Sequence, residues 1–336
     1  MTQLTAEQIT AYKSLVPSTI EHEPMAKHTS FRVGGSARLY VVAPSSDALL
    51  RAVDAAIETG VPWCVYGGGS NLLVADEGYE GVVVQAANRR ITHSAQRTSS
   101  KLSVEDVTSE AGAITAMVAR QSVDAGLTGF EWAIGVPGTV GGAVYGNAGC
   151  YGGEMKDVVV SVDAYRIKDR ARVTIPNAEC GFGYRTSMFK HEPHVILSCD
   201  LQLAMTQDVT AGKARMAEIM QKRKASQPLE QSSAGCVFKN FEISDPSALE
   251  ILSRSVEIPE AMKASGKISV GWLIDQAGMR GKSVGDVEVS MKHGNFFVNK
   301  GKARAQDVLA LISLVKMKVR DDLGIEMQEE VQLLGF

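Results

Sequence analysis

The sequence has no long apolar run, no excess of basic residues and no closely spaced pair of cysteines. No stretch reaches the roughly 18 uninterrupted apolar residues expected of a membrane helix. Residues 1–23 carry charges throughout, unlike a signal peptide. Because 35 Lys and Arg stand against 38 Asp and Glu, charge gives no general reason to bind a polyanion. We therefore expect a cytoplasmic protein with neither membrane nor nucleic acid as a partner.

Cysteine and histidine are few, and their spacing suits neither disulfides nor a metal site. The five cysteines are scattered and form no C-x-x-C pair, which indicates free thiols in a reducing compartment. His191 and His194 are separated by Pro193, so they cannot form the helical pair that many metal sites use. We expect no metal.

A chain of 336 residues can hold two or three domains. Helical spacing predicts a helix over 47–60, with an N-cap at 45–47 and Gly60 at its end. Residues 29–44 are predicted to form a strand with a turn at Gly34-Gly35, and alternation predicts a strand over 194–205. A polar helix ends near Gln227-Pro228, which we interpret as a domain boundary. The fold class predicted from these patterns is α+β.

Two glycine-rich segments dominate the rest of the sequence. YGGGSNLLV covers residues 66–74, IGVPGTVGGAVYGNAGCYGGE covers residues 134–154, and together they contain eleven glycines and little charge. Glycine lets backbone N–H groups approach an anion closely, so such loops can hold a pyrophosphate. The alternative, that the glycines serve tight turns only, is about as probable for one such loop but less so for two.

Neither segment is a familiar nucleotide signature. Leu72 stands where the last glycine of G-x-G-x-x-G belongs, which disfavours a Rossmann dinucleotide site. A P-loop ending in Gly281-Lys282-Ser283 also fails, because Gln276 occupies the position of its first glycine.

Four further motifs complete a recognisable order: CGFGYRTSMFK at 180–190, SAGCVFKN at 233–240, SVGWLIDQAGMRG at 269–281 and EEVQLLG at 329–335. With the glycine-rich segments, they resemble the UDP-N-acetylenolpyruvoylglucosamine reductase family, whose FAD-binding domain is of the vanillyl-alcohol-oxidase (PCMH) type. The resemblance runs from about His28 to the C-terminus, and it is closest to the shorter, type II-like branch.

The resemblance implies a two-part FAD-binding domain, 1–86 and 87–207, then a smaller α+β substrate-binding domain, 208–325, and a C-terminal segment, 326–336. It implies noncovalent FAD, NADPH as electron donor, UDP-N-acetylglucosamine enolpyruvate as substrate, and a monomer active in peptidoglycan precursor synthesis. The cofactor-binding residues carried over by motif are Tyr66, Gly67, Gly68, Gly69, Ser70, Asn71, Leu72, Gly135, Pro137, Gly138, Gly141, Asn147 and Gly149.

Three residues match the family's catalytic positions. Arg185 matches the arginine that stabilises the developing enolate, and Glu330 matches the catalytic glutamate. Cys236 stands where the family commonly has a serine general acid. A thiol, with a reference pKa of about 8.5, is a stronger acid than an alcohol, so the role can be kept. The alternatives are a surface ion pair for Arg185 and an inert buried thiol for Cys236.

Further matches concern the sugar nucleotide. The resemblance assigns substrate contacts to Tyr184, Arg223, Lys224, Lys239, Asn240 and Gln276. For Arg223 and Lys224, exposure to solvent without a ligand is about as probable. Trp272 fits helix core better than a stacking surface.

Two other functions use the same cofactor chemistry. A flavin oxidase acting on a hydroxy acid or sugar is the main alternative, although no covalent-flavin histidine motif is present. A flavoprotein that binds a sugar nucleotide without turnover is the second.

Overall fold

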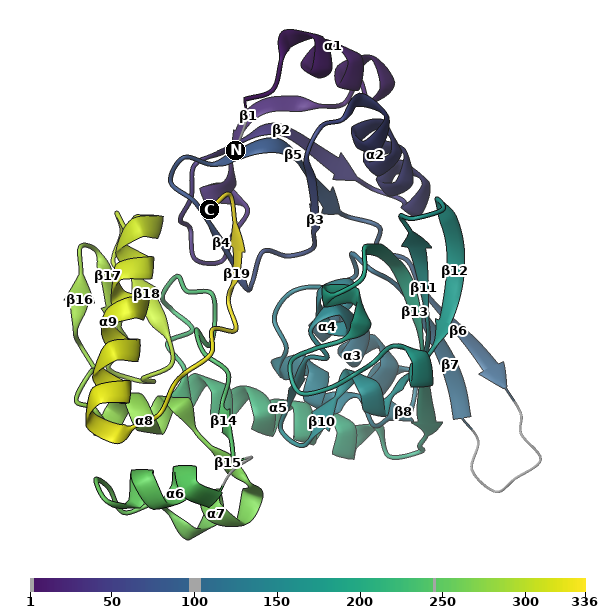
Figure 1. Cartoon of the computed structure of the whole chain (residues 1–336). Helices are drawn as coiled ribbons and strands as arrows, with labels where there is room; N and C mark the ends of the chain where they lie inside the picture. The colour runs from purple at the N-terminus through teal and green to yellow at the C-terminus, as the bar shows by residue number, and fades with distance from the viewer. Residues whose placement is uncertain (1–2, 97–103, 244–245) are drawn as a thin grey trace. The chain divides into compact units, whose positions relative to one another are not determined.

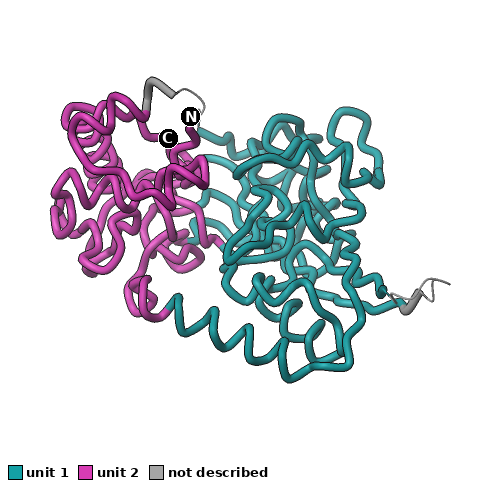
Figure 2. Tube along the Cα trace, turned by 90° about the horizontal axis from the view of Figure 1, so that it is seen from below, with its two compact units in different colours: residues 1–23, 37–68, 80–223 teal, residues 24–36, 69–79, 224–336 magenta. Residues whose placement is uncertain are grey.

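In the computed structural model, residues 3–96, 104–243 and 246–336 are described. The chain divides into two compact units, each assembled from separate stretches of sequence (Figure 2). Unit 1 comprises residues 1–23, 37–68 and 80–223, and unit 2 comprises residues 24–36, 69–79 and 224–336. Both units combine helices with β-sheet (Figure 1), which confirms the predicted α+β class.

Unit 1 begins with a four-stranded sheet in the order β1-β2-β5-β3, in which β3 and β5 are parallel. Its elements are α1 (Ala6–Leu15), β1 (Ile20–Pro24), β2 (Ser36–Ala43), α2 (Ser46–Thr59), β3 (Trp63–Tyr66) and β5 (Tyr79–Ala86). The parallel pair positions the first glycine-rich segment, because that segment begins where β3 ends.

The helix α2 shows why this part folds as the sequence predicts. The Ser45 side chain accepts a hydrogen bond from the Ala48 N–H, and Gly60 ends the helix with φ +65°. Leu49, Val53 and other apolar residues at helical spacing are buried in one cluster with the sheet.

The second part of unit 1 contains a larger antiparallel sheet, in the order β12-β11-β13-β7-β6, with β8 also paired to β13. Its strands are β6 (Ile91–Gln96), β7 (Val104–Glu110), β8 (Leu127–Thr128), β11 (Val159–Arg166), β12 (Ala171–Pro176) and β13 (His194–Met205). Its helices are α3 (Thr115–Asp124), α4 (Val140–Tyr145) and α5 (Val209–Ser226). Short elements fill the loops: η2 (Glu131–Gly135), β9 (Gly149–Cys150), β10 (Gly153–Glu154), η3 (Met155–Asp157), η4 (Asn177–Glu179) and η5 (Met188–Lys190). The predicted strand over 194–205 is confirmed.

Unit 2 consists of short strands and helices around one long helix, α9. Its strands are β4 (Leu72–Val74), β14 (Phe241–Glu242), β15 (Lys267–Ile268), β16 (Ser283–Val284), β17 (Val287–Val289), β18 (Phe297–Asn299) and β19 (Gln332–Leu334). Its helices are η1 (Met25–Lys27), α6 (Pro246–Ser253), α7 (Glu260–Ser265), α8 (Val270–Gln276) and α9 (Ala305–Leu323). The strands form a β16-β17-β18 sheet and the pairs β14-β15 and β19-β4.

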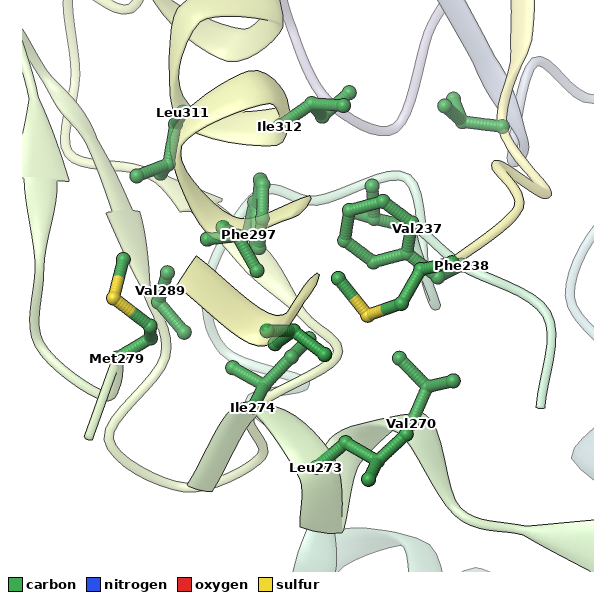
Figure 3. Close-up of a cluster of buried hydrophobic side chains, with 14 of the residues drawn as sticks. Val237, Phe238, Val270, Leu273, Ile274, Met279, Val289, Phe297, Leu311 and Ile312 are labelled. Carbon is green, nitrogen blue, oxygen red and sulfur yellow. The ribbon is translucent and has the colours of Figure 1, made fainter. Parts of the chain in front are cut away.

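The core of unit 2 is a single apolar cluster (Figure 3). Val237 and Phe238 contribute to it, and the rings of Phe238 and Phe297 meet edge to face with centroids 6.0 Å apart. Leu273 and Ile274 are fully buried there, and Trp272 is partly buried against the same cluster, as predicted for helix core. This packing anchors the chain immediately after Cys236.

The predicted strand over 29–44 is wrong in its first half. Only β2, from Ser36 onward, is extended, while Phe31 and Val33 are buried in the core of unit 2. Gly34 has φ +120°, and a Cβ there would lie 2.5 Å from the Cβ of Val74. Apolar residues alternate here because the side chains of Phe31 and Val33 enter the core of unit 2, which is formed mainly by residues far along the chain.

Among the helices in the described part of the chain, none combines the length and apolar character needed to cross a membrane.

Candidate functional site

The two glycine-rich segments meet inside unit 1. A Cβ on Gly67 would lie 2.0 Å from Oγ1 of Thr139, and a Cβ on Gly68 would lie 3.0 Å from Cα of Gly138. A side chain at Gly67 would displace Thr139, and one at Gly68 would press tightly against the backbone of Gly138. The two loops therefore pack against each other at this junction, which joins positions about seventy residues apart in sequence, while their binding of one ligand remains a prediction.

Thr139 belongs to this junction and lies within the stretch 135–141 that the resemblance assigns to the cofactor, although its motif does not single it out. It is only 7% exposed, and its Oγ1 has no hydrogen-bond partner among residues 3–96, 104–243 and 246–336. Leaving a buried hydroxyl unpaired costs about 1–3 kcal/mol, so a ligand that accepts a hydrogen bond from it would remove this cost. An orphaned donor beside closely packed glycines fits the phosphate groups of FAD.

Other glycines of the second segment serve packing. The Gly141 N–H already donates to the Ala111 carbonyl at 2.8 Å, and a Cβ on Gly141 would lie 2.8 Å from the Ala111 Cβ. A Cβ on Gly135 would lie 3.1 Å from the Cys150 sulfur. Gly138 has φ +94° and follows the exposed Pro137. The assignment of these glycines to FAD remains a prediction.

Tyr66 is the last residue of β3 and the first residue of the first glycine-rich segment. Its hydroxyl lies 2.8 Å from that of Tyr40, which donates to Oε1 of Gln85 at 3.1 Å. Burial, followed by the hydrogen bond with Tyr40, raises the pKa of Tyr66 far above its ordinary value. The phenol is therefore neutral at any physiological pH.

The side chain of Asn147 organises the loop that also contains Gly149. Nδ2 of the fully buried Asn147 donates to the Glu154 carboxylate at 2.8 Å and to the Gly183 carbonyl at 2.9 Å. Its Oδ1 accepts from the Lys156 N–H at 2.9 Å. These bonds tie the second glycine-rich segment to the 180–190 motif.

Arg185 is fixed beside that segment. Its Nη2 donates to the Gly149 carbonyl at 3.1 Å, and its guanidinium carbon lies 5.4 Å from the centre of the Tyr184 ring. The Lys190 ammonium donates to the Arg185 carbonyl at 2.8 Å. Unit 1 therefore brings the predicted catalytic arginine to the predicted cofactor loop.

A second guanidinium reaches the same region. Burial raises the pKa of the Cys150 thiol to about 11, and the charges of Arg223 and Arg185 oppose that rise. Both arginines therefore act electrostatically on one point of unit 1, where they can attract an anionic ligand.

In unit 2, residues 69–72 complete the first glycine-rich segment. Gly69 has φ +61°, and a Cβ there would lie 2.2 Å from the His28 carbonyl oxygen, so only glycine fits. Ser70 and Asn71 are half-buried. Leu72 begins β4, which pairs in parallel with β19.

The segments that carry Cys236 and Glu330 run side by side in unit 2. The Glu330 N–H donates to the Val237 carbonyl at 2.8 Å, and Phe238 bridges to Glu329. Both Cys236 and Glu330 are half-buried. The structure thus brings a thiol-bearing segment and a carboxylate-bearing segment together across about ninety positions of sequence.

The substrate residues predicted in unit 2 lie around the same segments. The Lys239 N–H donates to the Gln328 carbonyl at 2.9 Å. Oδ1 of Asn240 accepts from the Val270 N–H at 3.2 Å, at the start of α8. Gln276, at the other end of α8, is exposed. The Lys224 carbonyl accepts from the Lys292 ammonium at 2.7 Å.

Within the described ranges, no three His, Cys, Asp or Glu side chains are arranged to hold a metal ion.

Two family models match the chain, one over much of unit 1 and one over most of unit 2. A family model described as an FAD binding domain matches residues 37–169, and one described as the C-terminal domain of UDP-N-acetylenolpyruvoylglucosamine reductase matches residues 227–334. These matches define an FAD-dependent oxidoreductase, so the predicted FAD-binding domain and the C-terminal domain that follows it are confirmed.

Full-length relatives narrow this class. UDP-N-acetylenolpyruvoylglucosamine reductases from Heliobacterium modesticaldum and Agathobacter rectalis are each 37% identical to the chain. Both alignments cover 94% of this chain; they cover 90% of the Heliobacterium protein and 94% of the Agathobacter protein. The crystal structure of the reductase from Thermus caldophilus, 32% identical, superposes with a TM-score of 0.70 over 94% of this chain and 98% of its own. The chain belongs to the UDP-N-acetylenolpyruvoylglucosamine reductase family, as the motifs predicted.

Proposed function

We propose that the protein reduces the enolpyruvyl group of UDP-N-acetylglucosamine enolpyruvate to give UDP-N-acetylmuramate, with NADPH as the electron donor. Bound noncovalently, FAD supplies the two-electron transfer that connects NADPH to the alkene. One hydride from NADPH and one proton from the protein balance the reduction of one carbon–carbon double bond.

The alkene is conjugated to a carboxylate, which decides what the protein must supply. Hydride addition at the terminal carbon moves negative charge into that carboxylate, so a cation must face it. Arg185 provides a planar guanidinium that stays charged and can bind both carboxylate oxygens. Its contacts with Gly149 and Lys190 hold it in place before substrate arrives.

The second carbon must then receive a proton. Cys236 donates it in this proposal, and Glu330 stabilises the enol form of the carboxylate. The single observation that carries the proposal is the hydrogen bond from the Glu330 N–H to Val237, the neighbour of Cys236. This hydrogen bond joins the motif of Cys236 to the motif of Glu330, and the proposed protonation step needs both side chains close together.

The remaining matched residues bind the two nucleotides. The junction of Gly67, Gly68 and Thr139 would hold the FAD pyrophosphate, using an orphaned hydroxyl and closely packed backbone. Arg223 would bind the substrate diphosphate, supported by its electrostatic effect near Arg185. Asn240 would use its Nδ2 group, because its Oδ1 is already bonded to Val270.

We further propose that substrate contacts are completed by Tyr184, Lys224, Lys239 and Gln276. The enzyme would act as a monomer in the cytoplasm, in peptidoglycan precursor synthesis, on which cell shape and division depend. We also propose a division of the chain by function. Residues 1–86 and 87–207 would bind FAD, residues 208–325 would bind the substrate, and residues 326–336 would carry Glu330.

Absorbance of the purified protein tests this proposal. A yellow protein should bleach when NADPH is added without oxygen and regain its colour when the enolpyruvyl sugar nucleotide follows, with a product two hydrogens heavier. Bleaching by a hydroxy acid or sugar, with recovery in air, would identify an oxidase instead. Substrate binding without NADPH consumption would identify a binding protein.

A further inference from the structure

We infer that Asn71 and Gln332 are positioning residues that hold the backbone of Glu330 for the proposed reduction, on which this inference rests. Nδ2 of Asn71 donates to the Glu330 carbonyl oxygen at 3.0 Å, and Nε2 of Gln332 donates to the same oxygen at 2.9 Å. A carbonyl oxygen has two acceptor sites, and the two side-chain amides occupy both.

The opposite side of the Glu330 backbone is fixed as well. Its N–H donates to the Val237 carbonyl at 2.8 Å. The main-chain donor and acceptor of Glu330 are therefore both bonded, one to the segment that follows Cys236 and the other to Asn71. Such complete satisfaction restricts the φ and ψ of Glu330 and so the origin of its side chain.

Asn71 can position Glu330 because it is itself held firmly. Its carbonyl accepts from the Gln332 N–H at 2.9 Å, immediately before the parallel pairing of β4 with β19. Leu73 and Val74 of β4 are buried, and the carboxylate of Asp76 accepts the Ala305 and Gln306 N–H groups at the start of α9 at 2.8 and 3.0 Å. The Asn71 amide is thus attached to the rigid core of unit 2.

This arrangement changes the role expected of Asn71. The motif assigns it to FAD, yet its side-chain donor is directed to a residue 259 positions away. Removing the amide should therefore impair the step that uses Glu330, while its backbone can still contribute to the cofactor turn.

A double-mutant cycle with Glu330→Gln tests the coupling. Asn71→Ala should slow single-turnover oxidation of the reduced flavin by substrate about tenfold, the effect of about 1.4 kcal/mol. FAD affinity and the rate of reduction by NADPH should change less than threefold. In the Glu330→Gln background, Asn71→Ala should add less than a twofold loss, because the group it positions is gone.

Gln332→Ala should behave in the same way if Asn71→Ala folds poorly, and Leu333→Ala is the matched control. Leu333 lies on the same strand, is 50% exposed, and should leave the oxidation rate unchanged. Asn71→Asp should slow that step at least as much as Asn71→Ala, because a carboxylate cannot donate a hydrogen bond to the Glu330 carbonyl. Thermal unfolding checks that each variant is folded.

Losses that multiply in the double variant, or a loss confined to FAD affinity, would overturn the inference while leaving the reductase activity established. A native protein that binds no FAD, or that substrate does not reoxidise, would instead overturn the proposed function.

Discussion

The ammonium of Lys190 donates a 2.8 Å hydrogen bond to the backbone carbonyl of Arg185. Arg185 has φ +55°, a left-handed conformation that costs roughly 1–2 kcal/mol for a residue with a side chain. Lys190 also lies 5.5 Å above the centre of the Tyr145 ring. The lysine thus stabilises an unfavourable backbone that directs the arginine toward Gly149.

Replacement of Lys190 by Met should slow oxidation of reduced flavin by substrate about tenfold, because a hydrogen bond to a charged group contributes about 1.5–3 kcal/mol. Reduction by NADPH should stay within twofold. Stopped-flow absorbance separates the two rates. The exposed Lys168, changed to Met, is the control, and equal losses in both half-reactions would remove the assigned role of Lys190.

Replacement of Cys236 by Ser should retain much of the activity, whereas Ala should slow oxidation of reduced flavin at least a hundredfold, the typical contribution of a general acid. The alanine variant should still be reduced by NADPH at nearly the native rate. If it is reoxidised by substrate as fast as the native protein, Cys236 does not supply the proton.

Replacement of Thr139 by Val should have opposite effects on two measurements. The apoprotein should gain about 1 kcal/mol in its free energy of unfolding, because a buried hydroxyl without a partner in the described ranges is removed. FAD affinity should fall about tenfold, measured by fluorescence titration. Thr139→Ser should keep the native affinity, and a Val variant that binds FAD normally would exclude the hydroxyl from the cofactor site.

His293 should make stability depend on pH. Burial lowers the pKa of its ring below the ordinary 6.5, Arg280 adds to the shift, and Asp275 opposes it. As pH falls through about 6.5, the unfolded chain binds a proton before the folded one does, so stability is lost below that pH and is present above it.

In the native protein, the Asn295 N–H donates a 3.2 Å hydrogen bond to Nδ1 of His293. The variant His293→Asn keeps a hydrogen-bond acceptor at this position. Its free energy of unfolding, measured by urea titration, should therefore fall less between pH 7 and pH 5 than that of the native protein. The exposed His191→Asn should retain the native slope. A native slope in His293→Asn would show that another group is responsible.

Local signals in the sequence were sufficient for the regular elements. The Ser45 cap, apolar spacing and Gly60 specify α2, and alternation specifies β13, because both patterns depend on neighbours within a few residues. Residues 29–35 resemble a strand in sequence but are not one, because Phe31 and Val33 enter a core formed mainly by residues beyond 230. The spacing of apolar residues indicates which side chains are buried, but it does not indicate which segments of the chain they pack against.

For the site, the sequence alone determined the family, through the order and spacing of motifs around Arg185, Cys236 and Glu330. Only the tertiary structure showed that Gly67 lies against Thr139 and that Asn71 holds Glu330. These contacts join segments that are far apart along the chain. Their geometry depends on how strands such as β4 and β19 pair, and no local pattern of residues encodes that pairing.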